Sequence, residues 1–338
     1  MRIVAAYRYT TSKGYKQDWV KAIADGVNKH EDWQCKLIDG VSIDPQAEYS
    51  FVFNYQREPS SELTKGSHKL RRRLFEKHTD GKIFCLDGDI LISYLGLKHK
   101  RELLAGMKAE MENGIRYVRI PFTHVYEPKA RFFIKDNWED RWQDIMNNKG
   151  INQVKEYDKQ GDQILIVCNR GSEGYSGMGV PAWRYAMDTI TELRKHSKRP
   201  IVVRLHRANN IYRKIDIEQL ENFFRTHGIQ GVEIQSKKYM GEFTTGNYPD
   251  LLEEINKSWA ICTLASSAAG PALIEGKPVF VGAPECFFYN WRSGELSDIE
   301  SPNYNIDRNS FFKKYSFAHW NYPEVRNGIF WENVKYGL

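Results

Sequence analysis

Residues 259–282, WAICTLASSAAGPALIEGKPVFVG, predict a strand, a tight turn, a short helix, a second turn and another strand. A strand–helix–strand unit of this length is typical of parallel neighbours in an α/β sheet. Small residues fill the first turn, among them Ser266, Ser267 and Ala268, and we expect them to leave the amides of the next helix uncovered for a phosphate or another anion. Glu275 lies near the helix end. This layout suits the diphosphate and ribose of a nucleotide-sugar.

Strand-like and helix-like segments alternate along most of the chain, which predicts parallel sheets with helical crossovers. The expected strands cover residues 3–6, 34–38, 49–54, 82–86, 115–120, 163–168, 201–205, 232–234, 259–263 and 278–281. The expected helices cover residues 17–30, 68–77, 95–112, 136–148, 182–196, 216–227, 249–257 and 268–275. We therefore expect an α/β protein with two doubly wound, Rossmann-like domains.

The 338 residues are enough for two domains. Because residues 121–158 are rich in aromatic and charged side chains, we place the linker there. We expect a first domain over residues 1–158, a second over 159–308 and a helical segment over 309–338. That last segment is rich in large aromatic side chains that need a surface to pack on, so we expect it to cross back to the first domain.

Composition argues against several classes of protein. No apolar run reaches the roughly 18 residues of a transmembrane helix, and the N-terminus lacks the pattern of a secretory signal. Five cysteines are scattered without CxxC spacing, as expected for buried thiols in a reducing compartment. We therefore expect a cytoplasmic protein with no membrane partner and no zinc site.

Cationic residues follow two strands of the second half at their carboxyl ends, where open α/β sheets bind ligands. Arg170 and Gly171 begin a glycine-rich loop, and Arg204 and His206 end the next strand. Alternate strand residues point the same way, so Arg204 and His206 are expected to face one anion. An ordinary surface pair and a flexible loop are the structural alternatives.

Two common nucleotide motifs are absent from the sequence. The glycine-rich loop after Asn169 does not match G-x-G-x-x-G, and no acidic residue follows the next strand for a ribose hydroxyl. The segment from Gly270 to Pro278 has one residue too many for a P-loop, and Pro278 replaces its Ser or Thr. Nicotinamide enzymes and P-loop NTPases are therefore excluded.

Asp87-Gly88-Asp89 follows a strand of the first half. A carboxylate at a strand end can act as general base on a hydroxyl group, so Asp87 and Asp89 are the candidate catalytic residues. D-x-D also binds a divalent metal in some sites, and two acidic residues around a glycine form a common turn. The anion-binding features lie in the second half, so we favour a base over a metal and expect no metal requirement.

Basic residues cluster in the first half. Arg8 and Lys13 flank the loop after the first strand, and the segment near residue 70 is strongly basic. The residues of that segment that we expect to contact phosphates are Lys69, Arg71, Arg72 and Arg73. Such clusters neutralise phosphates of nucleic acids, although a solvated helix face has the same composition.

Two such domains with a returning C-terminal segment resemble GT-B glycosyltransferases. The stretch SSAAGPALIEGKPVFVG is similar to their nucleotide-sugar segment, and the continuation over residues 296–328 resembles phage-encoded glycosyltransferases. The strand end Arg204-Leu205-His206 is similar to R-x-H-P of capsule Kdo transferases, with Arg207 in place of proline. The resemblance covers roughly residues 160–330.

The resemblance implies sugar transfer from a nucleotide-sugar, in the form of a UDP-sugar, across a cleft between the two domains. Glu275 would hold the donor ribose, and the turn at residues 266–268 together with the cationic strand ends would hold its diphosphate. Phage enzymes of this fold glycosylate hydroxymethylated pyrimidines, which implies a DNA partner and residence in a host cytoplasm. Three alternatives stay open: transfer to a surface polysaccharide or lipid-linked sugar, a sugar- or nucleotide-binding protein without activity, and an epimerase.

Overall fold

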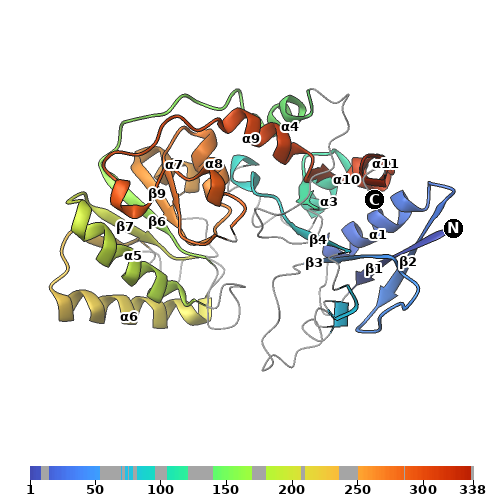
Figure 1. Ribbon diagram of the computed structural model, residues 1–338, viewed down its shortest axis with the longest axis horizontal. Coiled ribbons are helices and arrows are strands. Elements are labelled where there is room, and N and C mark those ends of the chain that lie inside the picture. Colours follow the sequence, from blue (N-terminus) through green and yellow to red (C-terminus); the bar gives the residue numbers. More distant parts are fainter. Residues whose placement is uncertain are drawn as a thin grey trace. The chain divides into compact units, whose positions relative to one another are not determined.

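The computed structural model describes residues 1–8, 15–53, 70, 73–74, 76–78, 82–95, 105–120, 140–169, 180–206, 210–235, 250–284 and 286–335. The chain divides into two compact units, shown in Figure 1. Unit 1 comprises Met1–Ile92, His99–Ile151 and Ser310–Leu338. Unit 2 comprises Ser93–Lys98 and Asn152–Asn309.

Unit 1 is built on a six-stranded sheet of order β11-β5-β4-β3-β1-β2. Its parallel strands are β1 (Arg2–Arg8), β2 (Trp33–Asp39), β3 (Tyr49–Phe53) and β4 (Ile83–Gly88). The other two, β5 (Tyr117–Arg119) and β11 (His319–Asn321), pair antiparallel with each other, and β5 is also antiparallel to β4. Sequence periodicity did not reveal this reversal, because a strand added near a sheet edge can pair in either direction.

The helices of unit 1 cover the sheet with apolar stripes. They are α1 (Tyr15–Val27), α3 (Ala105–Glu112), α4 (Arg141–Lys149), α10 (Tyr322–Arg326) and α11 (Ile329–Lys335). The short helix η1 (Ile92–Leu95) begins at the last residue of this part of unit 1 and continues into unit 2. Trp19 of α1 packs edge-to-face on Tyr322, with ring centroids 5.3 Å apart. Trp331 of α11 is fully buried against Trp33 and Phe51. Residues from both ends of the chain therefore share one core.

Unit 2 is built on a fully parallel sheet of order β10-β9-β6-β7-β8. Its strands are β6 (Gln163–Val167), β7 (Ile201–Arg204), β8 (Val232–Ile234), β9 (Ser258–Thr263) and β10 (Val279–Val281). The order reverses between β6 and β9. Open α/β sheets bind ligands outside the carboxyl ends of the strands at such a switch point.

Helices flank the sheet of unit 2 and bury its apolar residues. They are α5 (Ala182–His196), α6 (Asn210–His227), α7 (Leu251–Lys257) and α8 (Ala269–Ile274), with short turns at η4 (Tyr289–Trp291) and η5 (Leu296–Asp298). Ala186, Ile190 and Leu193 of α5 are completely buried at helical spacing against the sheet. The helix α9 (Arg308–Ser316) begins in unit 2 and leads back to unit 1.

The predicted fold class is confirmed: two doubly wound α/β units, with a C-terminal segment that returns to the first. The expectation that the two domains face each other across a cleft stays a prediction. Residues 152–158, expected in the linker, group with unit 2 because the Lys155 amide donates to the Ile274 carbonyl and the Asp158 amide to the Gly276 carbonyl. The binding roles assigned to the two domains stay predictions.

Candidate functional site

At the switch point of unit 2, the backbone amides of the turn after β9 are hydrogen-bonded within the protein. The Ala265 amide donates to Asn169 Oδ1 across the switch point at 3.1 Å, and the Ser266 amide donates to Thr263 Oγ1 at 3.0 Å. The Ala268 amide donates to Ser266 Oγ, while the amides of residues 269 and 270 bond carbonyls of residues 266 and 267. The expectation of uncovered amides is therefore wrong for these five residues. Small polar side chains supply three of the acceptors and main-chain carbonyls of the turn supply two, in place of a bound anion.

The turn nevertheless exposes one residue at its tip. Ser267 is exposed, whereas Ala265, Ala268 and Ala269 are buried. Ser266 and Ser267 thus lie beside the switch point, as the sequence predicts, and their role in ligand binding stays a prediction.

Arg204 lies at the carboxyl end of β7 but points into the protein. The residue is 8% exposed, and its guanidinium donates to Gln235 Oε1 at 3.0 Å, just past the end of β8. His206 follows and is partly exposed. Arg204 therefore has a structural bond at this edge, and the expected shared anion for the pair stays a prediction. Arg170 and Gly171 lie outside the described residues.

Glu275 lies at the far end of α8 from the turn. Six helical residues separate it from Ala268, which places it about 10 Å farther along the helix axis. Its side chain is 6% exposed, and both carboxylate oxygens are bound: Tyr94 Oη donates to Oε1 at 2.8 Å, and Lys155 Nζ contacts Oε2. Burial, with the neighbouring Glu275 carboxylate, raises the pKa of Tyr94 far above its usual value, so its hydroxyl stays a donor. The role of Glu275 as a ribose ligand stays a prediction.

Asp89, at the carboxyl end of β4 in unit 1, is the centre of a closed charge cluster. Lys149 Nζ contacts Oδ2, His319 Nε2 lies 3.1 Å from Oδ1, and the Leu91 amide donates to Oδ1 at 2.8 Å. The side chains of Asp89, Lys149 and His319 are at most 3% exposed. Burial alone would raise the pKa of Asp89, but the charges of Lys149 and His319 outweigh it and hold that pKa well below its usual range. Asp89 is thus an ionised anchor whose oxygens are occupied.

Asp87 lies in β4, directly opposite Arg119 of β5, and Arg119 in turn is paired with His319 of β11. Its backbone therefore occupies the same row of the sheet as two other residues with ionisable side chains. The structure describes the position of Asp87 in the strand but not its side chain. The predicted catalytic role of Asp87 stays a prediction.

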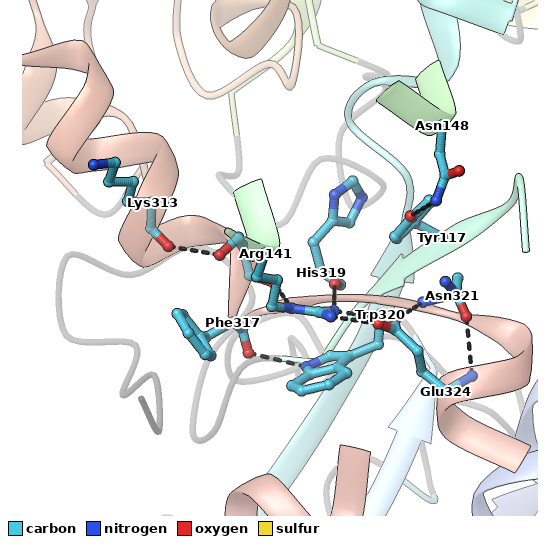
Figure 2. A network of polar contacts seen from close by, with 10 residues as sticks. Tyr117, Arg141, Asn148, Lys313, Phe317, His319, Trp320, Asn321 and Glu324 are labelled. Atoms are coloured by element: carbon cyan, nitrogen blue, oxygen red, sulfur yellow. Dashed lines mark hydrogen bonds and ion pairs between the residues drawn. The ribbon is translucent and has the colours of Figure 1, made fainter. Parts of the chain in front are cut away.

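Arg141 fixes the returning C-terminal segment, and sequence reasoning missed it. Its guanidinium donates to the carbonyls of Ser316 and His319, contacts the Glu324 carboxylate and lies 3.9 Å from the centre of the Trp320 ring, as Figure 2 shows in part. The sequence does contain a sign that Lys149, at the other end of α4, is buried: it lies on the apolar stripe formed by Trp142, Ile145 and Met146. A charged residue on such a stripe indicates a buried partner.

The basic residues predicted to contact DNA are mostly outside the described residues, namely Lys13, Lys69, Arg71 and Arg72. Arg73 is exposed and donates to the Val41 carbonyl at 3.0 Å. Lys77, on the same segment, donates to the carbonyls of Asp44 and Ala47. Arg8 forms a two-bond ion pair with Asp39, at 2.9 and 2.7 Å. The cations whose contacts are described thus hold unit 1 together.

Comparisons with known proteins give structural likeness without sequence likeness. No family model and no curated protein matches the chain. Similar solved structures include the β-Kdo 2,7-transferase of Thermosulfurimonas dismutans KpsC, with a TM-score of 0.48, 12% identity and coverage of 99% of this chain and 100% of that one. The β-Kdo 2,4-transferase of the same protein has a TM-score of 0.42 at 8% identity, covering 93% and 89%. A Methanocaldococcus jannaschii UDP-GlcNAc 2-epimerase has a TM-score of 0.29 at 9% identity over both full chains.

Identities and TM-scores this low say nothing of activity, which has to be argued from this chain's own residues. In the parts of the chain that the structure describes, no three His, Cys, Asp or Glu side chains are grouped as metal ligands. Among the same residues, no helix is both long and apolar enough to span a bilayer. The expectation that no metal is required stays a prediction.

Proposed function

We propose that the protein transfers a sugar from a nucleotide-sugar donor to a hydroxyl group of an acceptor. The observation that carries this proposal is the switch point between β6 and β9, where a turn of small residues follows β9 and Ser267 is exposed. Neither nicotinamide nor P-loop patterns are present to explain that turn. The resemblance of its sequence to the nucleotide-sugar segment of GT-B enzymes supports a UDP-sugar as the ligand.

In this proposal unit 2 binds the donor. The diphosphate lies at residues 266–268, with His206 and the Arg170–Gly171 segment as further contacts. Cationic groups and the serine hydroxyls of the turn stabilise the charge that develops on a leaving diphosphate, and this is the largest contribution expected from the protein. No catalytic step in this scheme needs a metal.

Unit 1 binds the acceptor, and Asp87 acts as the general base. A base should have a pKa near the working pH, whereas the pKa of Asp89 is held far below it and both of its oxygens are occupied. We therefore assign proton abstraction from the acceptor hydroxyl to Asp87. Asp89 orders the end of β4 that carries it.

The proposed acceptor is the hydroxymethyl group of a modified pyrimidine in DNA. The resemblance to phage-encoded enzymes and the basic composition of residues 69–73 support it. A surface glycan or lipid-linked sugar is the second candidate. The contacts of Arg73 and Lys77 favour that alternative, because these two cations bind main-chain carbonyls of unit 1.

The test is to incubate the protein with UDP-sugars and one of three acceptors: hydroxymethylated DNA, unmodified DNA or a glycan. Mass spectrometry of the digested products then detects a sugar adduct. We expect an adduct on hydroxymethylated DNA only; an adduct on the glycan alone would move the acceptor to the second candidate. Absence of any adduct, together with no binding of UDP, would refute the proposed function.

Two variants test, in the same assay, which residues bind the donor and which act as the base. Ser267→Tyr should weaken UDP binding at least tenfold by filling the exposed tip of the turn, while Ser301→Tyr, another exposed position of unit 2, should not. Asp87→Asn should lower kcat by about 10²-fold or more with little change in the affinity for UDP, as expected when a general base is lost. Equal kcat in Asp87→Asn and wild type would remove Asp87 from the mechanism.

A further inference from the structure

Asn169 follows β6 directly at the switch point of unit 2, and its side chain joins two neighbouring strand ends. Strand β6 ends at Val167, Cys168 is completely buried and Asn169 is partly exposed. Asn169 Oδ1 accepts a hydrogen bond from the Ala265 amide, in the turn after β9, at 3.1 Å. Asn169 therefore lies at the edge of the sheet where open α/β proteins bind ligands, and it is held there by the turn.

The bond to Ala265 fixes the orientation of the Asn169 amide group. A main-chain N–H has to face the side-chain oxygen, so Nδ2 is the atom that is turned away from Ala265. Nδ2 carries two N–H donors, and in the described part of the chain it forms no hydrogen bond. Because Asn169 is partly exposed, these two donors remain available to a ligand.

The hydroxyl groups around Asn169 differ in what they leave available. Thr263 Oγ1 donates to the Val167 carbonyl at 2.9 Å and accepts from the Ser266 amide at 3.0 Å, so its only hydrogen is used. Ser266 Oγ accepts from the Ala268 amide at 3.3 Å, which occupies a lone pair and leaves the hydroxyl hydrogen for another partner. The same turn therefore positions two side-chain donors, Asn169 Nδ2 and Ser266 Oγ.

These donors determine the kind of group that fits beside them. The main-chain amides of residues 265, 266 and 268–270 are bonded within the protein, so a ligand at this point meets side-chain donors instead. An amide nitrogen only donates, and its natural partner is a group that only accepts, such as an oxyanion. Hydrogen bonds from N–H and O–H groups to a phosphate oxygen are charge-assisted and about twice as strong as those between neutral groups.

We propose that Asn169 binds a phosphate oxygen of the nucleotide-sugar through Nδ2, while its Oδ1 holds the turn after β9. This inference rests on the proposed function, in which the diphosphate lies at residues 266–268. An aspartate at this position would accept the Ala265 amide equally well but would repel the diphosphate. Among side chains of this size, an amide is the one that serves both contacts.

The test separates the two roles of this side chain. Asn169→Asp keeps its size and the oxygen that accepts the Ala265 amide, but exchanges the two N–H donors for a negatively charged oxygen. Isothermal titration calorimetry on the full chain measures the affinity for UDP and for inorganic diphosphate. We expect Asn169→Asp to weaken binding of both by about 30-fold or more. Its melting temperature should stay close to that of wild type, because the cap on the turn is kept.

Asn303→Asp is the matched control. Asn303 is an exposed residue of unit 2 whose Oδ1 also accepts a main-chain amide, that of Asn305, at 2.9 Å. It lies toward the amino end of β10, because the Asn303 amide donates to the Ser293 carbonyl and the Ser293 amide donates to the Val279 carbonyl. The variant makes the same change of charge at the opposite edge of the sheet and should bind both ligands as wild type does.

The outcomes distinguish this inference from the proposed function. Equal binding of UDP by Asn169→Asp and wild type overturns the inference alone, because Asn169 would then only cap the turn. An equal loss in Asn303→Asp overturns it as well, because the effect would then follow the net charge. If wild type binds inorganic diphosphate in the expected Asn169-dependent way but does not bind UDP, the phosphate site stands and the proposed function fails. Binding of neither ligand by wild type refutes both.

Discussion

The carboxylates Asp89 and Glu275 are both buried, but their partners come from different kinds of segment. Each is nearly inaccessible to water and each contacts a lysine, but Lys149 beside Asp89 is completely buried whereas Lys155 beside Glu275 is half exposed. The partners of Asp89 come from α4 and β11, which are regular elements of the same unit. The partners of Glu275 come from segments that connect the units. A carboxylate of the first kind holds regular elements together, and one of the second kind holds connecting segments to the end of α8.

The largest effect that tests this contrast is expected from replacing the two lysines. Lys149→Met leaves Asp89 as a buried charge without its cation, which should lower the free energy of unfolding by about 3–5 kcal/mol. Lys155→Met should cost at most about 1 kcal/mol, because its side chain is half in water. Urea denaturation measures both. Similar losses in the two variants would show that the clusters are equivalent after all.

The sequence predicted β4, which leads to Asp89, and α8, which ends before Glu275, but not η1 and β11, which carry their partners Tyr94 and His319. Alternating apolar segments and turns placed the strands that end at Asp89 and at Ser266, because these signals are local. The partners of Asp89 and Glu275 lie 60 to 230 residues away in the sequence, as Lys149, His319, Lys155 and Tyr94 show. No periodicity encodes such pairings. Likewise, small residues after β9 predicted uncovered amides wrongly, because Asn169 and Thr263, which cap two of these amides, lie at the ends of neighbouring strands.

A second comparison uses the glycines that follow Lys149 and Glu275. Gly150 and Gly276 both adopt positive φ, +66° and +76°, but a Cβ atom meets nothing within 4 Å at Gly150 and meets the Glu156 carbonyl at Gly276. Gly150→Ala should therefore cost about 1–2 kcal/mol, the cost of a left-handed backbone alone. Gly276→Ala should cost about 3 kcal/mol or more, because the Glu156 main chain also has to move. Equal melting temperatures for the two variants would contradict the close fit around the end of α8.

The smallest expected effect is a pH dependence that belongs to Asp89. Because its pKa is lowered in the folded protein, its contribution to stability is complete above the unfolded value of about 3.9 and is lost as the pH falls toward the folded one. Between pH 7 and pH 3 wild type should lose about 1 kcal/mol that Asp89→Asn does not lose. Urea denaturation at the two pH values measures this difference. Asp144→Asn, on the exposed side of α4, controls for the change in net charge, and it should keep the wild-type loss.

The return of the C-terminal segment to unit 1 determines the order in which the molecule can be completed during synthesis. The sheet of unit 1 lacks β11, and its core lacks Phe330 and Trp331, until the last thirty or so residues have been translated. Unit 2 ends at Asn309. The half of the protein that the ribosome makes first is therefore the half that finishes folding last, and its exposed aromatic core has to be kept from aggregating for the whole time that unit 2 is being translated.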